Sequence, residues 1–99
     1  MRILNQHTFL SATTTAGTSS KYLTDYRIGD KIERTIQGTL TSGATVQLYT
    51  HVNLTNENTR HLVSTFSTSS FSTVIDGPVA AVEIVKSGAS GTAWVDGLV

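Results

Sequence analysis

Residues 44–54 show the longest alternation of apolar and polar side chains in the sequence, and this pattern constrains the fold most. Apolar residues occupy the even positions except Thr50, and more polar residues lie between them. A period of two is typical of a β-strand with one face in a core and the other in solvent. Ser42-Gly43, just before it, favours a tight turn. The sequence therefore predicts a half-buried strand here.

Shorter runs of the same kind predict seven further strands. Their expected limits are 3–10, 22–28, 32–40, 61–67, 71–75, 79–86 and 92–99, and Leu62 and Phe66 are expected to share a face. Strands that follow one another every 8–12 residues or so, without intervening helices, are typical of two-sheet folds. We therefore predict an all-β chain: a single antiparallel β-sandwich or jelly-roll-like domain of about eight short strands.

Composition agrees with this fold class. The 99 residues include 17 Thr and 11 Ser, and 38% are hydrophobic, which is enough for a packed core. Threonine and valine favour strands, and helix-forming residues are dispersed. No repeat or linker divides the chain. We expect residues 1–20 to form an extended N-terminal strand or arm and polar loop that orders only against a partner, and residues 21–99 to form the sandwich.

Charge and cysteine content exclude several function classes. Seven basic and seven acidic residues give a formal net charge of zero, and the basic ones are scattered, so no nucleic-acid partner is expected. The absence of cysteine excludes disulfides, thiolate zinc sites and cysteine nucleophiles. The longest apolar run, 78–82, is far shorter than a bilayer span, so no membrane partner is expected.

Two histidines form the only constellation with metal-ligand character. His51 and His61 are equally distant from Asn56 in an expected hairpin loop, 53–60, so they can stand as a cross-strand pair, with Glu57 or a neighbouring subunit as third ligand. The alternative is two partly exposed polar positions on the solvent face. Zinc sites need three or four ligands, so the alternative is favoured, and we expect no metal and no cofactor.

No pattern supports an enzyme. Asp25, Asp30 and Glu33 alternate with basic residues, which is typical of solvated turn charges rather than a catalytic carboxylate pair. No Gly-x-Ser-x-Gly elbow occurs, and Gly88-x-x-Gly91 lies between two expected strands rather than before a helix. We expect no catalytic residues. Among other charged positions, Arg34 is expected at the sheet margin and Glu83 on the solvent side of its strand.

The aromatic residues leave two interpretations open. Trp94 with Tyr22, Tyr26 and Tyr49 would suit a sugar-binding platform on a sandwich face. Burial of Trp94 in the core or in a subunit interface is the more common outcome for so large a side chain. We take Tyr49, Phe71 and Trp94 as the candidate subunit interface.

Three segments carry a family resemblance: Gly38 to Leu48, the polar hairpin 53–60, and Gly77 to Ala93 with its Ser-Gly-x-x-Gly-Thr loop. The stretch that contains them, from Gly17 to the C-terminus, resembles small β-sandwich virion proteins of tailed bacteriophages, most closely capsid decoration (cement) proteins. The resemblance covers about four fifths of the chain.

The resemblance implies a non-enzymatic protein, made in the host cytoplasm, that binds the capsid exterior of the virion. It would bridge subunits of the major capsid protein, as a homotrimer, and stabilise the shell. Leu4, Gln6, Thr13 and Thr14 in the N-terminal segment are the candidate capsid contacts. The alternative is a tail, neck or fibre-associated β-sandwich that binds a carbohydrate or a receptor.

Overall fold

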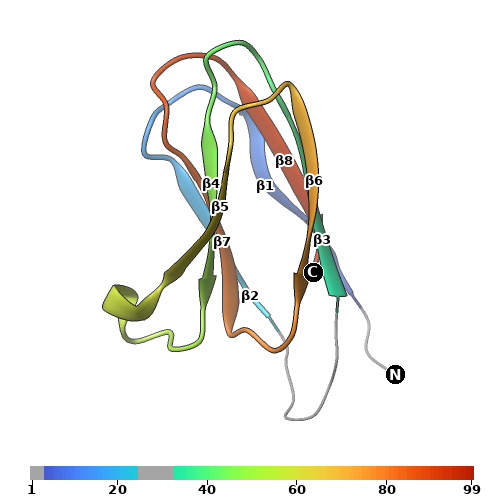
Figure 1. Ribbon diagram of the computed structural model, residues 1–99, viewed down its shortest axis with the longest axis vertical. Helices are drawn as coiled ribbons and strands as arrows, with labels where there is room; N and C mark the ends of the chain where they lie inside the picture. Colours follow the sequence, from blue (N-terminus) through green and yellow to red (C-terminus); the bar gives the residue numbers. More distant parts are fainter. Residues whose placement is uncertain (1–3, 25–32) are drawn as a thin grey trace.

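Two antiparallel four-stranded sheets pack face to face in the computed structural model, which describes residues 4–24 and 33–99 (Figure 1). One sheet has the strand order β1-β8-β3-β6 and the other β2-β7-β4-β5. The strands are β1 (Gln6–Thr13), β2 (Ser19–Leu23), β3 (Glu33–Leu40), β4 (Val46–His51), β5 (His61–Phe66), β6 (Ser70–Asp76), β7 (Ala81–Lys86) and β8 (Ala93–Leu98). The predicted all-β sandwich is confirmed.

The strand limits follow the alternation closely, because each strand ends where the period-two pattern meets turn residues. β1, β2 and β4 differ most: β1 runs on to Thr13, β2 starts at Ser19 rather than Tyr22, and β4 ends at His51 rather than Leu54. Residues 25–28 of the second expected strand lie outside the described residues. A short 3-10 helix, η1 (Glu57–Thr59), interrupts the loop between β4 and β5.

The core lies between the sheets and is built from the inward-facing residues of both. Ile36 and Val95 from one sheet, and Leu48 and Ile84 from the other, are completely buried. Phe66 of β5 stacks on Phe71 of β6, with ring centroids 4.1 Å apart, so this pair closes the gap between the two sheets at one edge.

Gly38 is required by this aromatic stack. A Cβ added at Gly38 would lie 2.5 Å from the ring of Phe71, which is opposite it on β6, and 2.9 Å from the carbonyl oxygen of Trp94. Real Cβ atoms do not approach other atoms so closely, so any side chain here would displace Phe71 or the backbone of β8.

The N-terminal segment belongs to the sandwich rather than to a separate arm. β1 pairs with β8 along its length, and Phe9 and Leu10 are buried in the core. The backbone of Asn5 also exchanges two hydrogen bonds with Val99. The expected division into 1–20 and 21–99 is thus not a division of this fold, because two buried apolar side chains and a full strand pairing tie β1 to the rest.

Two strands carry irregularities in register. Pairing between β1 and β8 shifts twice, and Ala12 in that stretch has a positive φ of 48°. Pairing between β4 and β5 shifts between Leu48 and Tyr49, where β5 has one extra residue. That bulge places Leu62 opposite Tyr49 but Phe66 opposite Val46, on the other face. The expectation that Leu62 and Phe66 share a face was wrong for this reason.

Two cationic side chains are buried by backbone that wraps around them. Arg34, at the start of β3, is 1% exposed, and its Nη1 donates to the carbonyl oxygen of Gly77 at 3.0 Å. Lys86, at the end of β7, is fully buried, and its Nζ donates to the carbonyl oxygens of Gly88 and Ser90. In both cases turn carbonyls replace the water that the cation loses.

Candidate functional site

The two sheets differ in what lies on their outer faces. On the β2-β7-β4-β5 sheet, Lys21, Glu83, Tyr49 and Leu62 lie side by side across the four strands, and residues 52–60 with η1 fold back toward this row. We call this surface the covered face. Asn56 caps η1, since its side-chain oxygen accepts from the backbone nitrogen of Asn58, and Asn53 does the same for Thr55.

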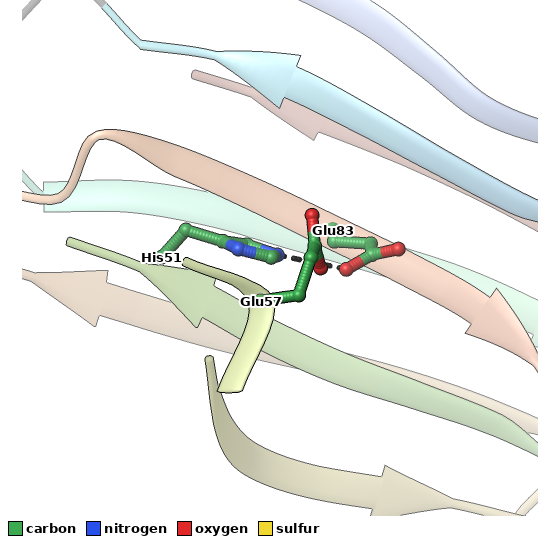
Figure 2. A group of neighbouring side chains, drawn as sticks. All are labelled: His51, Glu57 and Glu83. Carbon is green, nitrogen blue, oxygen red and sulfur yellow. Dashed lines mark hydrogen bonds and ion pairs between the residues drawn. The ribbon is translucent and has the colours of Figure 1, made fainter. Parts of the chain in front are cut away.

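A buried histidine–glutamate pair lies at the centre of the covered face (Figure 2). His51 Nε2 lies 2.8 Å from Glu83 Oε1, and the two residues are 1% and 7% exposed. They meet because Tyr49 pairs with Glu83, which makes His51 a diagonal neighbour of Glu83 on the same face. Glu83 points away from the core, as expected, and His51 lies on the same outer face. The loop contacts that face there, so both side chains are buried, and the expected partial exposure of His51 was wrong.

Two cations complete the ion pairs of this cluster. Arg60 Nη1 lies 3.4 Å from Glu83 Oε1, and the Arg60 guanidinium carbon lies 4.0 Å above the ring of Tyr49. Lys21 Nζ lies 2.9 Å from Glu57 Oε1. The hydrogen bond from Lys21 holds the pKa of the Glu57 carboxyl below its ordinary value. Both cations fasten the loop to strands beneath it.

His51, Glu57 and Glu83 each offer a ligand atom, and the three atoms lie within 4.8 Å of one another. Of the two histidines considered as a possible metal pair, only His51 is in this group. His61 is exposed and lies opposite Thr50 on β5, so it belongs to the other face of the sheet from His51. The structure brings Glu57, one of the two third ligands considered, close to His51, and places Glu83 rather than His61 beside them.

Sequence reasoning missed Glu83 and Arg60 as members of this site. Glu83 lies in the middle of the apolar run of β7, where a charged residue is costly unless it is paired. A charged residue at that position was the signal by which the sequence could have indicated Glu83 as part of a site. Its partners, however, depend on the register between β4 and β7 and on the path of the loop, neither of which the sequence pattern specifies.

The outer face of the β1-β8-β3-β6 sheet carries no covering loop among the described residues, and we call it the open face. Trp94, Leu98 and Val74 on it are 41%, 43% and 53% exposed. The row between Trp94 and Leu98 is polar and is formed by Thr8, Asp96, Gln37 and Ser72. Two grooves of about 510 and 530 Å³ share Gln37 and Asp96, so the polar row connects them.

The candidate capsid contacts are distributed along β1 and its ends. Gln6 is exposed and lines a groove of the open face. Leu4 and Thr13 are half-buried just before and at the end of β1, and Thr14 is exposed in the following loop. Gln6 is the first residue of the edge strand β1 and pairs with Leu98, so it lies at the margin of the open face.

The candidate subunit interface is not one surface. Trp94 lies on the open face, Tyr49 on the covered face, and Phe71 between the sheets against Phe66. Nor do the described tyrosines, Tyr22 and Tyr49, form an aromatic platform with Trp94. Tyr22 is half-buried, its hydroxyl accepting from Asn5 Nδ2, and Tyr26 lies outside the described residues.

None of the protein families, curated proteins and solved structures compared with the chain matches it. Within residues 4–24 and 33–99, no helix has the length and apolar character to cross a membrane.

Proposed function

We propose that this protein is a non-enzymatic virion component that decorates a bacteriophage capsid and stabilises it by bridging major capsid subunits. The open face is the surface proposed to dock on the shell. It presents three exposed apolar side chains beside a row of hydroxyl, amide and carboxylate groups, which is the mixture found in protein interfaces.

The exposure of Trp94 is the observation that carries this proposal. A tryptophan on a central strand that leaves 41% of its surface in water keeps a large apolar area available for a partner. Around it, Thr39 and Ser70 lie in the same row and carry no charge that would have to be desolvated.

A homotrimer suits the proposed contact between the open face and the capsid. Three weak contacts held in one trimer bind the capsid far more tightly than a single contact does. The proposed homotrimer would use surfaces other than the open face for self-association and leave three open faces directed at the shell. Bridging then follows from each face contacting a different capsid subunit.

Co-sedimentation with assembled capsids of the virus that encodes the chain tests the proposal. We expect Thr39→Arg, which introduces a charge beside Trp94, to weaken sedimentation with capsids at least tenfold. The matched control is Thr65→Arg, an exposed threonine that pairs with Gln47 on the other sheet, and it should sediment like the unmodified protein. Circular dichroism checks that both variants fold.

Three results would overturn this proposal. The unmodified protein could fail to sediment with capsids, Thr39→Arg could sediment normally, or Thr65→Arg could be the variant that loses binding.

Carbohydrate binding is a second candidate function, favoured by the position of Trp94 next to the polar row. Trp94 and Asp96 are two residues apart on β8, about 7 Å along the strand, so one sugar ring could stack on the indole while its hydroxyls reach the carboxylate. We expect a bound glycan to change Trp94 fluorescence, and Asp96→Asn to weaken the response. A flat response over a broad glycan panel would contradict this second function and leave the first intact.

A further inference from the structure

The cluster on the covered face has the donor set of a divalent metal site. One imidazole nitrogen and two carboxylate oxygens, from His51, Glu57 and Glu83, lie within 4.8 Å of one another. Ligands of a tetrahedral zinc ion, at bond lengths of about 2.0–2.2 Å, are about 3.5 Å apart. The His51 nitrogen and a Glu83 oxygen are already closer than that, at 2.8 Å, so a small separation of the pair admits an ion.

Two of the three donors are held in place and the third can move. His51 and Glu83 are buried on adjacent strands, so the sheet fixes their backbone, and only a small shift of the two side chains separates the ligand atoms. Glu57 lies on η1 with its side chain 61% exposed. Figure 2 shows its carboxylate directed at the other two side chains. Such a site has two preorganised ligands and a third that closes from the solvent side.

The charges around the cluster also favour a cation. Two carboxylates approach each other here, and without an ion their charges are offset from the side by Lys21 and Arg60. The side chains of Lys21 and Arg60 are 30% and 37% exposed, so each can release its carboxylate and turn to water at little cost. Lys21 therefore competes with a metal ion for Glu57.

We propose that His51, Glu57 and Glu83 bind a divalent transition-metal ion of the zinc type, with water in the remaining position. The imidazole ligand selects against Mg²⁺ and Ca²⁺, which take oxygen ligands. Bound there, the ion joins β4, β7 and η1, so it fastens the loop 52–60 to the covered face. The site is structural, and it is independent of the proposed capsid contact on the open face.

Zinc titration of the full chain after EDTA treatment and dialysis tests the site. Isothermal titration calorimetry should show one saturable site per chain, and the thermal unfolding midpoint should rise with zinc concentration. Glu57→Gln changes one exposed ligand and leaves the buried pair intact, so the variant should fold and bind zinc at least tenfold more weakly. Magnesium at the same concentrations should give neither signal.

Two further variants separate this site from adventitious binding. His61→Ala removes a nearby exposed imidazole that is not a ligand, and its zinc affinity should be unchanged. Lys21→Met removes the competing cation, and its zinc affinity should increase. The proposal is overturned if no saturable binding occurs up to about 1 mM zinc, or if Glu57→Gln binds like the unmodified chain. It is also overturned if His61→Ala is the variant that loses binding.

Discussion

The two outer faces of the sandwich use their side chains in opposite ways. On the covered face, the four charged residues Lys21, Glu57, Arg60 and Glu83 are all engaged in ion pairs with one another or with His51. On the open face, Asp96 is the central charge, and Glu33 and Asp76 lie opposite each other at one end of β3 and β6. Exposed apolar side chains accompany them.

The charged residues of the covered face make contacts within the molecule, whereas the side chains of the open face remain available to a partner. The ion pairs Lys21–Glu57 and Arg60–Glu83 hold the loop 52–60 against its sheet, so these charges are neutralised by partners within the molecule. The open face has no described basic residue, so within the described residues no ion pair joins its strands. A substitution should therefore change stability on the covered face and binding on the open face.

Replacing the central carboxylate of each face tests this comparison most strongly. Glu83→Ala leaves His51 and Arg60 without their shared acceptor, and we expect the free energy of unfolding to fall by about 2–3 kcal/mol. Asp96→Ala, on the matching central strand of the open face, should change it by less than about 0.5 kcal/mol. Urea denaturation measures both. Equal losses in the two variants would remove the distinction between the faces.

Arg60 has a smaller expected effect, because its side chain is 37% exposed. Arg60→Ala removes the contact with the Tyr49 ring and the 3.4 Å ion pair with Glu83, and should cost about 1 kcal/mol. Arg60→Lys keeps the charge without the planar guanidinium, so it should recover only part of that loss. Full recovery in urea denaturation would show that stacking on Tyr49 contributes nothing.

The smallest expected effect concerns the exposed pair Lys21–Glu57. In Lys21→Met, the pKa of Glu57 should rise toward its ordinary value of 4.5, as measured by NMR titration of the carboxyl carbon. Because folding lowers this pKa, the pair stabilises the fold above about pH 4.5, and the contribution is lost as the pH falls through the folded-state pKa.

The unmodified protein should therefore exceed Lys21→Met in stability at neutral pH, with the difference vanishing in acid and shrinking in salt. A Glu57 pKa that is unaffected by the loss of Lys21 would show that this pair does not form in solution.

Much of the fold was predictable because each strand carries its own period-two pattern. The strand from Val46 alternates cleanly, and β7 and β8 start and end close to the predicted limits. The pattern failed for Leu62, since one extra residue in β5 reverses the faces on either side of it. The alternation of apolar and polar residues along a short strand does not reveal whether the strand contains a bulge.

The covered face was less predictable, because the burial of its residues comes from other elements. His51 occupies a solvent-side position by its own strand's pattern, yet it is buried where the loop residue Glu57 approaches it. Glu83 is buried by the same approach. Predicting the site would require the register of β4 against β7 together with the path of the loop, which are long-range properties.

The irregular pairings in β1 and β5 have a consequence for self-association. Each sheet ends in two edge strands whose free backbone groups can template another chain. β1 and β5 are interrupted by bulges, and β2 is short and carries a lysine. β6 pairs without a shift over seven residues and exposes Val74. Aggregation of the folded protein should therefore begin at β6, where the described residues offer a regular edge to an added strand.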